Sequence, residues 1–144
     1  MSTKATRIPS AFKATTQALQ RLVEGNEPVR LILPRPPSLN ALYRAVGGRS
    51  IMSKDYRAWI KLAEQEAMLQ KPRLLKGRVG VYVEILLTDK RRRDIDNFGF
   101  KAVIDLLKKI GVIEDDDSRF VRVIHAKWVD AGPTCAVTVK RMLD

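Results

Sequence analysis

The chain has almost no residues with which to build a cysteine or histidine site. Its 144 residues include one cysteine, Cys135, and one histidine, His125. A single cysteine excludes an internal disulfide and a cysteine-rich zinc site. Any zinc site would then need mostly carboxylate ligands, which zinc rarely accepts. Because Cys135 lies in the apolar run Cys135-Ala136-Val137, we expect a buried structural thiol rather than a nucleophile.

Long hydrophobic runs are also missing. The best apolar stretch, residues 79–87, is interrupted by Glu84 and is far shorter than the roughly 20 residues of a membrane-spanning helix. The N-terminus lacks the apolar centre of a secretion signal. We therefore expect a cytoplasmic protein without a membrane partner.

Acidic residues are scarce relative to basic ones. There are 16 Asp and Glu residues against 27 Lys and Arg residues, which gives a formal net charge of +11. A surplus of this size predicts a polyanionic partner, with nucleic acid favoured over an anionic membrane surface. The hydrophobic content of 45% predicts a globular domain with a real core.

The acids that are present gather in one segment. Seven of the 16 lie between residues 94 and 117, where only three bases occur. A polyanion is attracted by the basic surroundings and repelled by bare carboxylates, and divalent cations resolve that conflict by neutralising them. The alternative interpretation is an ordinary solvated acidic segment.

The run Lys90-Arg91-Arg92-Arg93-Asp94-Ile95-Asp96-Asn97 places four cations directly before two carboxylates. A carboxylate pair suits Mg²⁺, and a cation cluster suits a phosphate backbone. At an extended strand end, Asp94 and Asp96 point to the same side and can share one metal ion, whereas in a helix they diverge by about 200°. The alternative role for Asp96 or Asn97 is to cap a helix.

Hydrophobic periodicity predicts both strands and helices along the chain, and we expect an α+β (α/β) fold with a mixed β-sheet flanked by helices. Residues 1–26 are expected to form a helical N-terminal arm, and residues 27–144 a single globular domain. Strands are expected at 27–34, 78–88, 120–129 and 134–142, and a hairpin around Gly47-Gly48. Helices are expected at 53–70 and 97–110.

Lys101 is expected one turn into the helix 97–110, beside the aspartate pair, where it would hold a scissile phosphate. The alternative is an ion pair with Asp105, four residues later, worth only about 0.3–0.5 kcal/mol on an exposed helix. A third acid from the turn 114–117 would complete the site if the helix returns that turn to the same edge. The pattern does not distinguish Asp115, Asp116 and Asp117.

Four motifs in order resemble the RusA family of Holliday junction resolvases. They are the proline loop at 33–40, the Arg-Arg-Asp-x-Asp-Asn core at 92–97, the Lys-Ala helix from residue 101, and the turn at 111–116. The resemblance runs from about Arg30 to the C-terminus, and the combination is specific. It implies that Asp94 and Asp96 are the first two catalytic aspartates, Asp116 the third, and Lys101 the essential lysine.

This chain departs from the family pattern at one place. Three residues, Phe98-Gly99-Phe100, separate Asn97 from Lys101, where two are expected. One additional residue turns a helix by about 100°. Either an irregularity at Gly99 absorbs it, or Lys101 is displaced from the site.

The prediction is therefore an Mg²⁺-dependent endodeoxyribonuclease, with Mn²⁺ as a plausible substitute, that nicks four-way DNA junctions as a homodimer. Lys90, Arg91, Arg92 and Arg93 are predicted to bind DNA phosphates. Two alternatives stay open: a non-catalytic DNA-binding protein, and a metal nuclease for other branched DNA or RNA.

Overall fold

The computed structural model describes Thr16 and residues 26–143. The predicted N-terminal arm lies, apart from Thr16 and Asn26, outside these residues and stays a prediction. No helix in the described part of the chain is long and apolar enough to cross a membrane.

A four-stranded mixed sheet forms the centre of the fold, in the order β1-β6-β4-β5. Its strands are β1 (Val29–Leu33), β4 (Val79–Leu86), β5 (Val121–Val129) and β6 (Cys135–Arg141). β4 runs parallel to β5 and antiparallel to β6, and β6 runs antiparallel to β1. The predicted α+β class, the mixed sheet and all four strands are confirmed.

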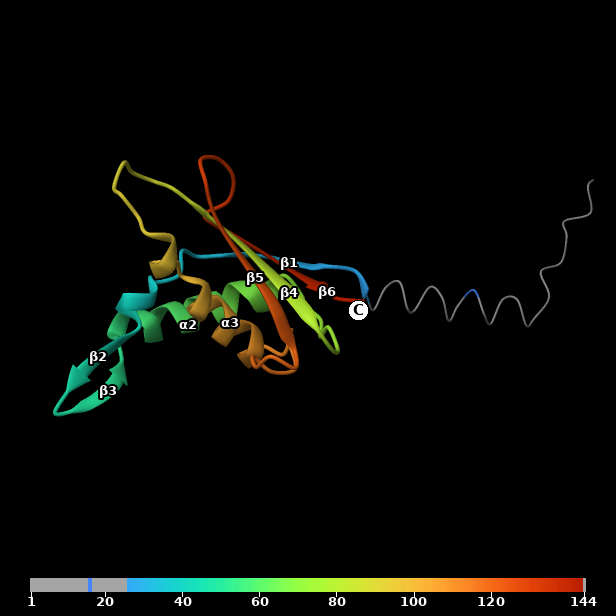
Figure 1. Cartoon of the computed structure of the whole chain (residues 1–144), viewed down its shortest axis with the longest axis horizontal. Helices are drawn as coiled ribbons and strands as arrows, with labels where there is room; N and C mark the ends of the chain where they lie inside the picture. The colour runs from blue at the N-terminus through green and yellow to red at the C-terminus, as the bar shows by residue number, and fades with distance from the viewer. Residues whose placement is uncertain (1–15, 17–25, 144) are drawn as a thin grey trace, which may run out of the picture.

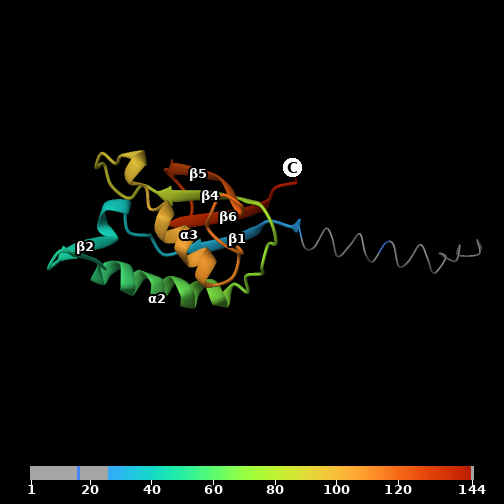
Figure 2. The same ribbon diagram turned by 60° about the horizontal axis from the view of Figure 1, so that its bottom comes forward.

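Two helices, α2 (Lys54–Leu69) and α3 (Phe100–Lys109), lie against one face of this sheet (Figures 1 and 2). Alternate residues of β4 point toward them and are buried, whereas Tyr82 and Glu84 point to the other face and are partly or fully exposed. The core therefore fills the space between the sheet and the helices. Cys135 is buried in this core, and burial raises the pKa of its thiol to about 12, as expected for a structural cysteine.

The helix predicted at 53–70 is confirmed, including its start. The Ser53 hydroxyl oxygen accepts a hydrogen bond from the Tyr56 N–H at 3.1 Å, which satisfies one of the free donors of the first turn. The helix ends at Gln70. Trp59, Ala63 and Ala67 line its buried side.

The predicted hairpin is formed by β2 (Tyr43–Val46) and β3 (Arg49–Met52). Gly47 and Gly48 connect the strands with φ values of 56° and 77°, which suits the two-residue turn of a tight hairpin. The hairpin projects away from the body of the molecule (Figure 1), and nearly all of its residues are exposed.

The segment between β4 and α3 differs from the prediction. β4 ends at Leu86, two residues before the predicted end of the strand, and Asp94 follows only after a loop, so Asp94 and Asp96 do not lie at an extended strand end. A strand continued through the basic run would place alternate cations on the helix-covered face, where burial of a charge is costly. The run therefore stays in solvent.

The helix predicted from Asn97 begins later, at Phe100, after a short 3-10 helix, η2 (Ile95–Asn97). Phe98 between them is fully buried, with its ring 4.6 Å from that of Trp128. Gly99 packs so closely on the proline loop that an added Cβ would lie 2.8 Å from Pro36 Cγ and from the Pro37 carbonyl oxygen. Packing of Phe98 and Gly99 thus interrupts the helix.

Candidate active site

Asp94 and Asp96 are both exposed, but they do not lie on a strand. Asp94 precedes η2 with extended backbone angles (φ −83°, ψ 134°), and Asp96 lies inside η2. The backbone therefore changes from extended to 3-10 between the two aspartates, which differs from the fully extended geometry that the shared-metal prediction required. Asp94, rather than Asp96 or Asn97, occupies the cap position, and its side chain makes no capping hydrogen bond.

Two polar side chains hold the ends of the loop that carries these aspartates. The Asn97 side-chain oxygen accepts a hydrogen bond from the Asn40 N–H at 2.8 Å, which joins η2 to the short helix η1 (Leu39–Ala41). The Arg35 guanidinium donates to the Leu86 carbonyl at 2.8 Å. The proline loop therefore holds both ends of the segment that carries Asp94 and Asp96. Arg35 and Asn40 lie in the proline-loop motif, but their partners, Leu86 and Asn97, were not predicted.

In the basic run, Asp89 holds the Arg93 side chain and the Arg91 backbone, whereas the side chains of Lys90, Arg91 and Arg92 are exposed. Arg93 Nη2 lies 3.0 Å from Asp89 Oδ2, and Asp89 also accepts a hydrogen bond from the Arg91 N–H. These contacts lower the pKa of Asp89, with the backbone hydrogen bond as the largest cause. Lys90, Arg91 and Arg92 are exposed, and Arg91 makes only a long ion pair at 4.0 Å. Asp89 was not predicted to take part.

Lys101 lies in the first turn of α3, and its ammonium group is 3.2 Å from Asp105 Oδ2. The alternative ion pair is therefore formed in this structure. Asp105 also accepts a hydrogen bond from the Tyr56 hydroxyl at 2.6 Å. Partial burial opposes the charge of Lys101, but the hydrogen bond to Asp105 and the nearby carboxylates, Asp116 among them, raise its pKa overall. Lys101 is thus a cation at neutral pH rather than a general base.

The three acids of the turn after α3 differ in how closely a cation holds them. Lys108 Nζ lies 3.0 Å from Asp115 Oδ1 and 3.6 Å from Asp116 Oδ1. The hydrogen bond with Lys108 is the main reason that the pKa of Asp115 falls to about 2. Asp117 binds Arg119 through both of its oxygens. Asp116 is therefore the exposed member with the weakest contact.

These partners lie along one side of α3. Lys101, Asp105 and Lys108 are spaced by four and three residues, which places them on one helix face. Tyr56 reaches this face from α2, and the acidic turn reaches it from beyond the last turn. The face is a row of alternating charges that ends at Asp116.

The described residues do not gather the predicted metal ligands. In Thr16 and residues 26–143, no three Asp, Glu, His or Cys side chains are close enough to hold one metal ion. η2 and the acidic turn lie at opposite ends of α3 (Figures 1 and 2). The donor types nevertheless suit Mg²⁺, which prefers oxygen ligands. Neither the Asp94 nor the Asp96 carboxylate is engaged by another described residue.

Comparisons with known proteins agree on one family. The family model described as Endodeoxyribonuclease RusA matches residues 34–140. A protein of Enterobacteria phage HK97 named Crossover junction endodeoxyribonuclease rusA is 33% identical over 105 residues, which cover 72% of this chain and 87% of the relative. Proteins named Crossover junction endodeoxyribonuclease RusA from Escherichia coli (strain K12) and Shigella sonnei (strain Ss046) are each 38% identical over 89 residues, covering 60% of this chain and 72% of the relative.

Proposed function

The chain belongs to the RusA family, and on this premise we propose that it is a cytoplasmic endodeoxyribonuclease that resolves four-way DNA junctions by paired nicks. One observation carries the proposal: the family match over residues 34–140 includes the basic run, both aspartates of the core, Lys101 and Asp116. The names of the relatives describe crossover junction endodeoxyribonucleases. These names favour the enzyme over the non-catalytic alternative.

We infer that Asp94, Asp96 and Asp116 hold Mg²⁺, or Mn²⁺ in its place. A bound divalent ion polarises a phosphoryl oxygen and makes water a better nucleophile. The carboxylates would fix that ion beside the phosphate, and their exposure leaves them open to it. Because η2 and the acidic turn are apart in this structure, a shared ion requires the two segments to approach each other.

Lys101 is proposed to bind the scissile phosphate and to stabilise the charge that grows on it. It must then leave Asp105. Its side chain is 41% exposed, and an exposed ion pair contributes no more than about 1 kcal/mol, so a phosphate can replace Asp105 at little cost. Tyr56 keeps its hydrogen bond to Asp105 after the exchange. Asp105 is therefore not left without a partner.

We propose two roles for the residues of the basic run: most contact DNA, and one stabilises the loop. Lys90, Arg91 and Arg92 are exposed and are proposed to contact phosphates that flank the cut. Arg93 has the same charge, but its contact with Asp89 orders the loop in the absence of DNA. We expect Arg93 to affect both the loop and DNA binding.

We also propose that the enzyme acts as a homodimer. A four-way junction has near-twofold symmetry, and two active sites related by a dyad can cut opposed strands. A monomer would have to dissociate and rebind between the two cuts. The dimer is thus the simplest assembly that gives paired nicks.

Cleavage of a set of labelled substrates tests the function. The set contains a four-way junction, a flap, a plain duplex and a structured RNA, each incubated with Mg²⁺ or with excess EDTA. We expect symmetrical nicks in the junction with Mg²⁺ only. Binding without cutting would support the non-catalytic alternative, and equal cutting of the flap or the RNA would support a broader nuclease. Cutting in EDTA would exclude the metal-dependent mechanism.

A further inference from the structure

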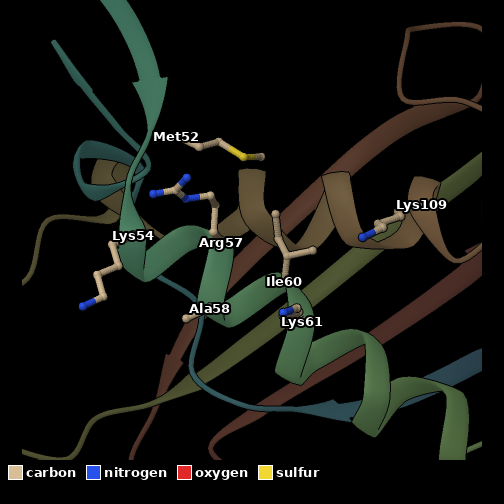
Figure 3. Close-up of a pocket in the computed structure, with 7 residues that line it drawn as sticks. All are labelled: Met52, Lys54, Arg57, Ala58, Ile60, Lys61 and Lys109. Atoms are coloured by element: carbon tan, nitrogen blue, oxygen red, sulfur yellow. The ribbon is translucent and has the colours of Figure 1, made fainter. Parts of the chain in front are cut away.

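A groove of about 600 Å³ lies beside the hairpin, outside the candidate active site. Most of its lining comes from α2, and the end of β3 and the last turn of α3 close its sides (Figure 3). None of Asp94, Asp96, Lys101 and Asp116 lines it. The groove is therefore a surface that the proposed cleavage site does not use.

The lining is strongly cationic. Lys54, Arg57 and Lys61 are spaced by three and four residues on α2, so they share one face of the helix. All three are exposed, and no ion pair to any of them occurs among the described residues. The fourth cation, Lys109 of α3, lies 2.9 Å from Glu64. No acidic residue lines the groove itself.

The floor between these charges is apolar. Met52 comes from the end of β3, and Ala58 and Ile60 come from α2 (Figure 3). Ile60 is half-buried against the core, so it fixes the floor, whereas the cations stand free around it. The cations of such a surface attract anionic groups of a ligand, and its apolar floor can pack against the less polar groups.

We propose that this surface, the basic groove, binds the sugar–phosphate backbone of a DNA arm. The inference rests on the proposed function, because that function makes DNA the polyanion. From Lys54 to Lys61 the helix rises by about 10 Å. Phosphates along one DNA strand advance by about 3.4 Å each, so the three cations of α2 cover about three phosphates. The apolar floor then faces the sugars.

A small anion fits the same surface less well. A specific small-ligand site needs donors that converge and are held in place by their surroundings. Here the donors are long, exposed side chains that spread along the helix, and Lys109 faces them from α3. An extended polyanion satisfies separate, mobile cations without requiring that they converge.

The basic groove is adjacent to the active-site residues on the same two helices. Arg57 follows Tyr56, which binds Asp105, and Lys109 follows Lys108, which binds Asp115. A DNA arm held in the groove therefore lies against the same two helices that carry the row of charges. This position suits a surface that orients the substrate without taking part in cleavage.

The test compares two triple variants that lose the same charges. The groove variant is Lys54→Gln, Arg57→Gln, Lys61→Gln. The control is Arg30→Gln, Lys76→Gln, Lys127→Gln, which removes three exposed cations from the sheet and its loops. Binding of a plain duplex and of a four-way junction is measured without Mg²⁺ over a range of salt concentrations. Thermal unfolding and sedimentation check the fold and the assembly of both variants.

We expect the groove variant to flatten the log–log salt dependence of binding by about 2.7, at about 0.9 for each of three phosphate contacts. At 0.1 M salt this corresponds to a loss of affinity on the order of 10²-fold. The control should lose only a few-fold and keep its slope. Equal losses in both variants would overturn the proposal, as would a groove variant that changes self-association and leaves DNA binding intact.

A second variant tests the groove by gain of binding. Glu64→Gln releases Lys109 from its ion pair and keeps the size of the side chain. We expect tighter DNA binding and a slope steeper by up to about 0.9. An unchanged slope in both this variant and the groove triple would overturn the proposal. Junction cleavage by the wild-type chain is scored separately, so a failure of the proposed function is distinguished from a failure of the groove.

Discussion

Asp115, Asp116 and Asp117 are consecutive in the chain, yet their side chains are held very differently. Lys108 engages Asp115 at 3.0 Å, and Arg119 engages both oxygens of Asp117. Asp116 is exposed, and its nearest cation is at 3.6 Å. A metal ligand must have oxygens that are available, and within this turn the oxygens of Asp116 are those least engaged by cations.

If Asp116 is the metal ligand proposed above, Asp116→Asn should reduce Mg²⁺-dependent cleavage by at least about 100-fold, because it removes the charge of that ligand. Asp117→Asn should change cleavage only a few-fold, since it breaks a surface ion pair with Arg119. Single-turnover cleavage of a labelled junction measures both. The reverse order would mean that the register through the turn is off by one residue.

Lys101 is the residue for which the two sequence interpretations compete most directly. It forms the ion pair with Asp105, and it also lies on the face of α3 that leads to Asp116. We expect Lys101→Ala to lose cleavage by about 100-fold or more while it retains junction binding, as for a group that acts on the reacting phosphate.

Asp105→Asn is the matched control for this variant. It breaks the same ion pair but leaves an oxygen that can accept the Tyr56 hydrogen bond. Its cleavage rate should stay near that of the wild type. Near-normal cleavage by Lys101→Ala would instead show that the additional residue before Lys101 has displaced it, and that a cation of the basic run has its role.

At the scale of secondary structure, Gly99 decides where α3 begins. There is no room for a side chain at this position, because a Cβ added to Gly99 would lie 2.8 Å from both Pro36 Cγ and the Pro37 carbonyl oxygen. Gly99→Ala should destabilise the fold by about 1–3 kcal/mol, the range for overpacked sites. The better helix propensity of alanine offsets less than about 1 kcal/mol of this.

Urea unfolding measures that loss, and a second substitution tests its cause. Pro36→Ala removes the Cγ contact, so the double variant should be more stable than the sum of the two single effects predicts. An unchanged unfolding midpoint for Gly99→Ala would mean that the proline loop moves aside without cost.

The sequence correctly predicted the ends of elements that are set by interactions between residues close together in the chain. Ser53 caps α2 through its own neighbour, and Gly47-Gly48 closes the hairpin by its backbone angles alone. The start of α3 depends instead on contacts of Gly99 with Pro36 and Pro37, more than sixty residues earlier. Periodicity correctly predicted the helix and its buried side, but it contains no information on such distant contacts.

The same limit applies to the candidate site. The candidate residues were chosen because the acids and bases cluster within one segment, and their roles stay predictions. The sequence did not predict that Tyr56 binds Asp105, a contact between residues 49 positions apart, or that Asp89 orders the basic run. The shared-metal hypothesis required Asp94 and Asp96 to lie at an extended strand end, and no local pattern indicated the loop and η2 that replace it.

At the scale of the whole molecule, the net charge of +11 governs how the protein meets DNA. If Arg91 and Arg92 each contact one phosphate, the double variant Arg91→Ala, Arg92→Ala should flatten the salt dependence of junction binding by about 1.8. Titrations at several salt concentrations measure the slope. An unchanged slope would show that these exposed arginines do not contact the duplex arms.

Paired cutting is the property that depends on the whole assembly rather than on one chain. If the protein is a dimer with one complete site per subunit, a subunit with Asp94→Asn still binds the junction but cannot cut its own strand. Mixing wild-type protein with a large excess of this variant converts most wild-type subunits into mixed dimers. Junctions with a single nick should then accumulate, while fully resolved products fall steeply.

The two products are distinguished on a supercoiled plasmid that extrudes a cruciform. A single nick gives a relaxed circle, and paired nicks within one binding event give a linear molecule. Wild-type protein alone should give mainly linear product, and the mixture mainly relaxed circles. The control is an excess of the triple variant Asp94→Asn, Arg91→Ala, Arg92→Ala. This variant should compete less for the plasmid, because it has lost two cations proposed to bind DNA. If the ratio of linear to relaxed product does not change in the mixture, then each chain cuts independently, and the dimeric mechanism is wrong.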